Sequence, residues 1–124
     1  MPDLKFTKKN RLLSSADFKD VFDNNTFKVS HPKLLLLAHF SQHPTSRLGL
    51  VVGKKNIPTA VGRNFVKRVV RETFRSTSFL KPVDVIFLAR KNADKLSPSE
   101  LSLLLQQSWC RLHDRCARSE KKHA

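Results

Sequence analysis

The amino-acid sequence predicts one α+β domain in which helices pack against a small β-sheet. Its 124 residues suit a single domain, and 40% of them are hydrophobic, which is enough for one core. Short apolar runs bounded by turn residues alternate with longer segments that have the helical period. The expected order is helix, strand, strand, helix, strand, helix (α-β-β-α-β-α), typical of a sandwich of one sheet and its helices. We expect this single domain to span residues 1–124.

Three segments carry a helix-start signal followed by apolar side chains at helical spacing. Each signal includes a Ser, Thr or Asn that can accept hydrogen bonds from the free amides of the first turn, and the third also has Pro and Glu in capping-box positions. We expect helices over 15–23, from 58 to 75 or 76, and from 97 onward. The candidate caps are Ser14, Thr59 or Asn56, and Ser97.

Three apolar runs predict strands at 34–41, 47–53 and 83–89. A short polar turn joins the first two, which predicts an antiparallel hairpin. The ends of the chain are polar: we expect an extended basic arm at 1–13 and a frayed polar tail at 115–124. Trp109 continues the apolar stripe of the last helix and is expected in the core.

The charge balance is strongly basic. Twenty-four Lys and Arg face ten Asp and Glu, for a net charge of +14 and a pI near 10.5. Self-repulsion of this size favours a polyanionic partner, most simply nucleic acid, whose condensed counterions are released on binding. An anionic membrane is the rival partner, but the cations are spread along the chain and no apolar stretch approaches the ~18 residues of a membrane span. We expect a cytoplasmic protein that binds no membrane.

The sequence contains no recognisable catalytic or metal-binding motif. Its five His and its carboxylates are not spaced as metal ligands or as partners of a nucleophile. Cys110 and Cys116 match no zinc or redox spacing, so we expect two reduced thiols. We therefore predict no catalytic residue and no metal or cofactor bound by the protein itself, and no protein partner is evident.

The expected helix from 58 carries a dense row of cations. At about 100° per residue, its basic residues and one Asn fall within an arc of about 140°. Phe65, Val66, Val69, Val70 and Phe74 fill most of the opposite side. An ordinary solvated face would intersperse acidic residues, but only Glu72 is present, so these cations need an external anion. The row consists of Arg63, Asn64, Lys67, Arg68, Arg71 and Arg75, and Lys54 and Lys55 precede the helix.

Three motifs in combination resemble bacterial ribonuclease P proteins over about residues 6–113. The family pattern R-L-x-x-x-x-D-F-x-x-V-F is met from Arg11 to Phe22, and G-x-x-V-x-K-K from Gly49 to Lys55. The pattern R-N-R-x-K-R-x-x-R-E-x-F-R is met from Arg63 to Arg75, except that Phe65 replaces the second Arg. That replacement puts one family RNA contact in doubt.

The resemblance implies a left-handed β-α-β crossover, against the right-handed norm. It also implies that an RNA subunit hydrolyses precursor tRNA with Mg²⁺, while the protein binds this catalytic RNA and the 5′ leader of the substrate. The catalytic RNA would lie on Lys54, Lys55 and the basic row. The leader would lie near Phe18 and Phe22, which suit base stacking, although core packing is the alternative for these rings. The leader-binding residues would be Lys8, Arg11, Phe18, Phe22 and Arg90.

Two other functions fit parts of the sequence. A ribosomal or RNA-chaperone protein that binds folded RNA would have the same charge and the same basic row, and only the combined motifs separate it from the first reading. A DNA-binding regulator would need a helix-turn-helix, and the expected strands argue against one.

Overall fold

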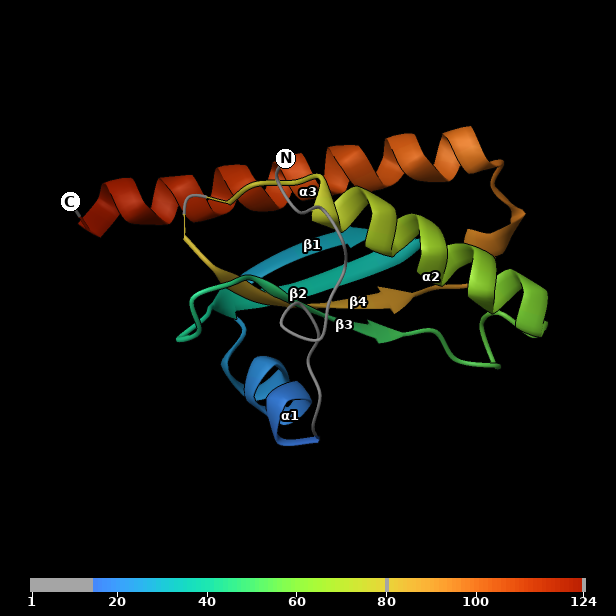
Figure 1. The fold of residues 1–124 in the computed structure, drawn as a ribbon, viewed down its shortest axis with the longest axis horizontal. Helices are drawn as coiled ribbons and strands as arrows, with labels where there is room; N and C mark the ends of the chain where they lie inside the picture. Colours follow the sequence, from blue (N-terminus) through green and yellow to red (C-terminus); the bar gives the residue numbers. More distant parts are fainter. Residues whose placement is uncertain (1–14, 80, 124) are drawn as a thin grey trace.

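The computed structural model describes residues 15–79 and 81–123 of the chain. Within these residues, three helices and four strands follow one another along the sequence, with one short 3₁₀ helix before the last helix (Figure 1). The elements are α1 (Ser15–Asn24), β1 (Phe27–His31), β2 (Leu34–Phe40), β3 (Arg47–Val51), α2 (Ala60–Arg75), β4 (Val83–Ala89), η2 (Ala93–Lys95) and α3 (Pro98–His123). The α+β class is confirmed. Among the described residues, no helix is both long enough and apolar enough to cross a bilayer.

The expected element order missed one strand, β1. Its sequence alternates, with Phe27 and Val29 buried and Lys28 and Ser30 exposed. Only two strongly apolar residues carry this period of two, and they follow directly on the polar end of α1. The signal was therefore present but short.

The expected hairpin between the strands at 34–41 and 47–53 is wrong. The strands lie in the order β1-β2-β4-β3, so β4 separates the two strands that the hairpin would have paired. Instead β2 pairs antiparallel with β1 and with β4, and β3 pairs parallel with β4. The hairpin partner of β2 is β1, across the two residues 32–33.

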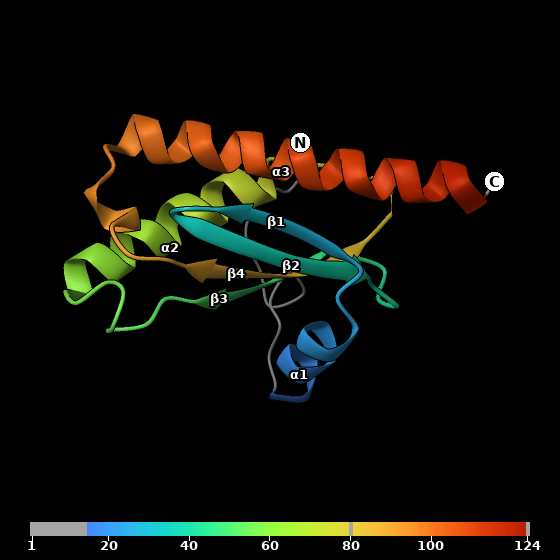
Figure 2. The same ribbon diagram turned by 180° about the vertical axis from the view of Figure 1, so that it is seen from behind.

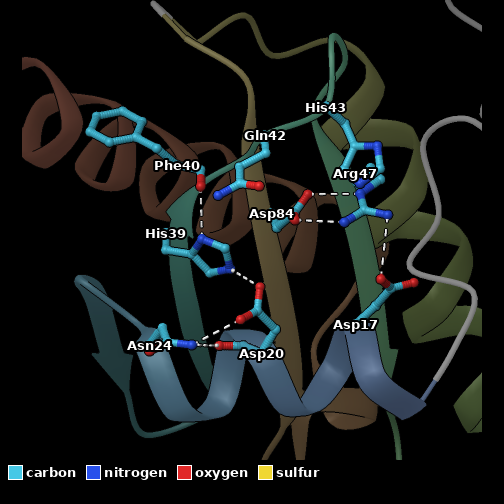
Figure 3. Close-up of a pocket in the computed structure, with 9 residues that line it drawn as sticks. All are labelled: Asp17, Asp20, Asn24, His39, Phe40, Gln42, His43, Arg47 and Asp84. Atoms are coloured by element: carbon cyan, nitrogen blue, oxygen red, sulfur yellow. Dashed lines mark hydrogen bonds and ion pairs between the residues drawn. The ribbon is translucent and has the colours of Figure 1, made fainter.

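The β3-α2-β4 unit is a left-handed crossover between neighbouring parallel strands. Figure 3 views the sheet from the side of α1, with Arg47 and Asp84 marking the starts of β3 and β4 near the top and β3 lying to the right of β4. Because α2 lies behind the sheet in this view, the path from β3 through α2 to β4 turns left-handed. The hand implied by the family resemblance is therefore confirmed.

Helices cover both faces of the sheet. Figures 1 and 2 show α2 and α3 on one face and α1 alone on the other. The main core lies under α2 and α3, where Leu34, Leu36 and Ala38 of β2 meet alternate residues of β4. A second, smaller core under α1 contains only three buried residues, Val21, Leu37 and Ile86. With so little apolar burial, α1 needs other contacts to fix its position.

Trp109 anchors α3 in the main core, as expected. It is 1% exposed, and its indole N–H donates a hydrogen bond of 2.9 Å to the Thr73 hydroxyl of α2. The capping box at the start of α3 is also present, because the Ser97 amide and the Glu100 carboxylate are 2.9 Å apart. The expected tail at 115–124 differs from the structure: α3 continues to His123, and Cys116 is buried.

Burial of Cys116 predicts a loss of stability at alkaline pH. Desolvation raises the pKa of its thiol to about 11, so the folded state keeps the thiol neutral where the unfolded chain already ionises it. The Cys116 thiol should therefore leave the free energy of unfolding unchanged below about pH 9 and lower it between about pH 9 and 11. At 1.36 kcal/mol per pKa unit, the loss is at most about 3 kcal/mol.

Urea denaturation at pH 8 and at pH 10.5 measures this effect. Cys116→Ala, compared at both values, should lose less stability on going to high pH than the wild type does. Equal losses in the two proteins would show that the alkaline effect arises elsewhere.

Candidate nucleic-acid interface

Helix α2 separates a core face from a charged face. Thr59 caps it, with the hydroxyl accepting a hydrogen bond of 3.0 Å from the Gly62 amide. Asn56, the other candidate cap, instead donates to the carbonyl of Ala89. The helix buries Val66, Val69, Val70, Thr73 and Phe74. The six residues of the expected row remain exposed or half-buried on its other side. We call Arg63, Asn64, Lys67, Arg68, Arg71 and Arg75 the α2 row.

The cations of the α2 row have no acidic partner among the described residues. Within the described residues, no carboxylate lies within 4.0 Å of Lys67, Arg68, Arg71 or Arg75. Arg63 is different, since its guanidinium donates to the carbonyls of Ile57 and Pro58 at 3.0 and 2.9 Å. It therefore also holds the segment before the helix. The remaining cations are available to an external polyanion.

Phe65, where the family pattern has Arg, is half-buried and packs against the main core. The replacement therefore exchanges a possible phosphate contact for apolar packing at the edge of the row. Its neighbours Asn64 and Lys67 keep their positions on the polar side of the helix.

The turn between β3 and α2 presents two further exposed lysines, Lys54 and Lys55. Hydrogen bonds fix the turn at both sides. The Ile57 amide donates to the carbonyl of Gly53 at 2.9 Å, and the Asn56 side chain donates to the Ala89 carbonyl at the end of β4 at 2.9 Å. Arg90 follows directly, so Lys54, Lys55 and Arg90 lie at the same end of the sheet.

Arg90 is only partly available. Its guanidinium donates to the His31 carbonyl at 3.1 Å, and its amide donates to the Lys33 carbonyl at 3.0 Å. It therefore ties the end of β4 to the β1–β2 turn, while the side chain stays half-buried. Lys8 and Arg11, the other two expected basic contacts of a leader, lie outside the described residues.

Helix α1 carries two partly exposed aromatic side chains one helical turn apart, Phe18 and Phe22. Phe22 is 42% exposed, whereas Phe18 is half-buried against the small core. The strand register places Leu35, Leu88 and Val51 in one row across β2, β4 and β3, and Val51 is 37% exposed. Leu35 and Leu88 pack on the same small core as Phe18. We call Phe18, Phe22, Leu35, Val51 and Leu88 the apolar strip. Two of its residues lie close to cations in the sequence: Leu88 is two residues before Arg90, and Val51 is three residues before Lys54.

A charged cluster occupies the other side of α1. Buried Asp84 of β4 receives two hydrogen bonds from Arg47 of β3, at 2.9 and 2.7 Å, and Arg47 also lies 3.6 Å from Asp17 of α1 (Figure 3). The hydrogen bond with Asp84 is the main cause that raises the pKa of Arg47, so the guanidinium stays charged. His39 donates through Nδ1 to the Phe40 carbonyl if Nδ1 carries the proton, and its Nε2 lies 3.5 Å from Asp20.

These contacts surround a cavity of about 380 Å³ between α1 and the sheet. They also connect the first half of α1 to β2, β3 and β4, and so supply the contacts that its small apolar core lacks. Sequence reasoning missed this cluster. The one available signal was Asp84, a charge in the middle of an apolar strand, which requires a buried partner.

The described part of the chain has no group of three or more His, Cys, Asp or Glu that could hold a metal ion. Its basic surfaces are rows of cations on a rigid helix and at strand ends, which is the chemistry of phosphate binding.

Together, the α+β sandwich and its unpaired cations define a basic nucleic-acid-binding protein. The family model described as Ribonuclease P matches residues 6–113. A ribonuclease P protein component from Pseudoalteromonas atlantica is 40% identical over 97% of this chain and 100% of its own length. An RNase P protein structure from Staphylococcus aureus is 28% identical, with a TM-score of 0.68, and the match covers 83% of this chain and 91% of that one. An RNase P protein structure from Thermotoga maritima is also 28% identical, with a TM-score of 0.62, over 78% of this chain and 96% of that one. The chain belongs to the ribonuclease P protein family, the protein subunits of this endoribonuclease.

Proposed function

We propose that this subunit binds both the catalytic RNA of ribonuclease P and the 5′ leader of precursor tRNA, and so promotes removal of the leader. The observation that carries the leader proposal is the apolar strip. It combines a 42% exposed Phe22 and a half-buried Phe18 with cations at the adjacent ends of β3 and β4. Unpaired bases stack on such rings while cations follow the phosphates.

The catalytic RNA is assigned to the α2 row together with Lys54 and Lys55. Cations without acidic partners on a helix whose other face is buried give a rigid array of positive charge, suited to a phosphate backbone. Helix rigidity matters, because it fixes the spacing of the charges before the RNA arrives. We assign the row to the RNA subunit and the strip to the substrate because Phe22 of the strip is 42% exposed, whereas Phe65 beside the row is half-buried against the main core.

Hydrolysis is assigned to the RNA subunit and its Mg²⁺, and the protein alone is expected to be inactive. The contribution of the protein is to neutralise phosphates that Mg²⁺ would otherwise screen. Cleavage of precursor tRNA should therefore need less Mg²⁺ when the protein is present.

Reconstitution with a bacterial ribonuclease P RNA tests this function. Cleavage at the mature 5′ end should be measured over a Mg²⁺ series with and without the protein, and with protein alone. We expect the midpoint of the Mg²⁺ dependence to fall when protein is added. An unchanged midpoint, or cleavage by RNA-free protein, would contradict the proposal.

Replacing two cations of the α2 row should weaken binding to the catalytic RNA without unfolding the protein. In Lys67→Ala/Arg68→Ala, two lost phosphate contacts should reduce the slope of log K against log salt by roughly 1.4 to 1.8. The affinity should be measured at several KCl concentrations. Lys19→Ala/Lys95→Ala removes the same charge from exposed residues outside the row and is the matched control. If both variants behave alike, the effect is one of net charge and not of the row.

Replacing the α1 aromatics should weaken binding of the precursor alone. Loss of a stacked ring costs about 1–3 kcal/mol per base, and mature tRNA has no leader to stack. Phe18→Ala and Phe22→Ala should each be assayed in the holoenzyme with precursor and with mature tRNA, and by thermal melting. Leu103→Ala, another exposed apolar residue (56% exposed), is the control.

The two rings should also differ from each other. Because Phe18 packs on the small core, its replacement should lower the melting temperature more than that of Phe22. An equal loss of affinity for precursor and mature tRNA would assign both rings to the fold and would remove the leader from this strip.

A further inference from the structure

Helix α3 carries a second row of cations that the proposed function does not use. Arg111, Arg115 and Arg118 are all exposed. At 100° per residue they fall within an arc of about 60°, and at 1.5 Å per residue they span about 10 Å of the helix axis. No described carboxylate lies within 4.0 Å of any of the three, although Asp114 is close in sequence and is 3.8 Å from His113 instead. We call these residues the α3 row.

The α3 row and the α2 row lie on opposite flanks of the two-helix layer. Between the helices runs a groove, formed by cavities of about 550 and 250 Å³. Residues of α3 that line the groove, such as Gln106, Cys110 and His113, lie on one side of its buried stripe, and the three arginines lie on the other. The same geometry places the α2 row on the flank of α2 that faces away from the groove.

The groove itself has no cations: among the residues that line it there is no Lys or Arg, and Glu72 and Asp114 are acidic. One stretch of RNA lying flat across both helices would therefore pass its phosphates over a neutral to acidic surface. Two separate segments, one on each flank, fit the charge distribution better.

The end of α3 is also built for a contact outside the core. Figures 1 and 2 show the C-terminal part of α3 extending beyond the edge of the sheet. Among the side chains of α3 that the structure describes, which end at Arg118, Cys116 is the last one buried in the core. Arg111, Arg115 and Arg118 lie on either side of this last buried position and are all exposed. Since no aromatic side chain of α3 is exposed beside the three arginines, unpaired bases have no surface on which to stack.

We propose that Arg111, Arg115 and Arg118 bind the phosphate backbone of a second, double-helical RNA segment, so that the protein joins two RNA segments on opposite flanks. This inference rests on the proposed function, in that the chain must bind RNA at all. The segment could belong to the catalytic RNA or to tRNA, because both offer the same phosphates.

The test is the variant Arg111→Gln/Arg115→Gln/Arg118→Gln, compared with Lys19→Gln/Lys28→Gln/Lys95→Gln, which removes the same charge from exposed residues outside both rows. A third variant, Arg111→Lys/Arg115→Lys/Arg118→Lys, keeps the charge. Thermal melting without RNA checks that each is folded. Binding is measured at several KCl concentrations to the catalytic RNA alone, and to mature tRNA by the preformed complex, with hydroxyl-radical footprints in both arms.

We expect the Gln variant of the α3 row to lose about tenfold or more in affinity in one arm and to reduce the salt slope there by about 2.7, at about 0.9 for each of three duplex phosphate contacts. It should also expose nucleotides different from those exposed by Lys67→Ala/Arg68→Ala, and the Lys variant, which keeps three cations, should keep the wild-type salt slope. The arm that shows the loss identifies the source of the segment.

The proposal would be overturned if the Gln variant of the α3 row kept the wild-type affinity, salt slope and footprint in both arms. It would also be overturned if that variant lost no more affinity than the control variant does, or if it exposed the same nucleotides as the α2-row variant. A wild-type protein that binds no RNA would overturn the proposed function and, with it, the second segment.

Discussion

Trp109→Ala should lower the free energy of unfolding by about 3–5 kcal/mol, a large part of the about 5–15 kcal/mol available to a domain of this kind. The indole is 1% exposed and makes an edge contact with Phe74 at a centroid distance of 5.3 Å. Its loss would open a cavity between α2 and α3 and remove the donor that the Thr73 hydroxyl accepts from. The Thr73 hydroxyl still donates its own hydrogen bond to the backbone of α2, so the variant removes only the hydrogen bond that this hydroxyl accepts.

Urea denaturation measures this loss, and two further variants separate its causes. Trp109→Phe keeps most of the volume but loses the hydrogen bond, so it should cost less than Trp109→Ala. Leu103→Ala, on the exposed side of the same helix, should change stability by no more than about 0.5 kcal/mol. A small effect of Trp109→Ala would show that α3 is not fixed to α2 by this residue.

Arg47→Met should destabilise the protein by about 3–5 kcal/mol, because it leaves the Asp84 carboxylate buried without its cation. Asp84 is 3% exposed, and Arg47 supplies two hydrogen bonds to it. The loss of stability should be larger than for Asp17→Asn. Asp17 lies 3.6 Å from Arg47 at the edge of the cavity, which is a longer contact than those between Arg47 and Asp84.

A double-substitution cycle tests the cause. Arg47→Met/Asp84→Leu removes both charges, and we expect it to be more stable than Arg47→Met alone. A double variant less stable than Arg47→Met alone would contradict this cause, because removing the stranded Asp84 carboxylate should relieve its cost. In variants that remain folded, loosening of α1 should also weaken precursor binding, because the apolar strip includes two residues of this helix.

The accuracy of sequence reasoning depended on how local each feature is. The capped start of α2, its core face and its row of cations all follow from side chains in one stretch, Thr59 to Arg75, so local sequence signals were enough to predict them. The pairing of the strands was not local. A short link between two strands favours a hairpin, but β4, from much later in the chain, inserts between β2 and β3 and offers each of them a longer buried partner.

The charged cluster under α1 could not be predicted for the same reason. Arg47 and Asp84 are 37 residues apart, and only the register of β3 against β4 makes them neighbours. The left-handed crossover had no basis in the residue pattern and came only from the family resemblance. Phe18 illustrates an intermediate case: spacing placed it on one face with Phe22, but only the structure separates the half-buried ring from the exposed one.

The central claim is that this protein recognises the leader, and the most direct test is the ratio of affinities for precursor and mature tRNA. The ratio should be measured for the catalytic RNA alone and for the complex with this protein, at one salt and Mg²⁺ concentration. Stacking of even one leader base, at about 1–3 kcal/mol, predicts that the protein raises the ratio by at least about fivefold. A ratio that stays the same while the protein is bound to the RNA would contradict the claim.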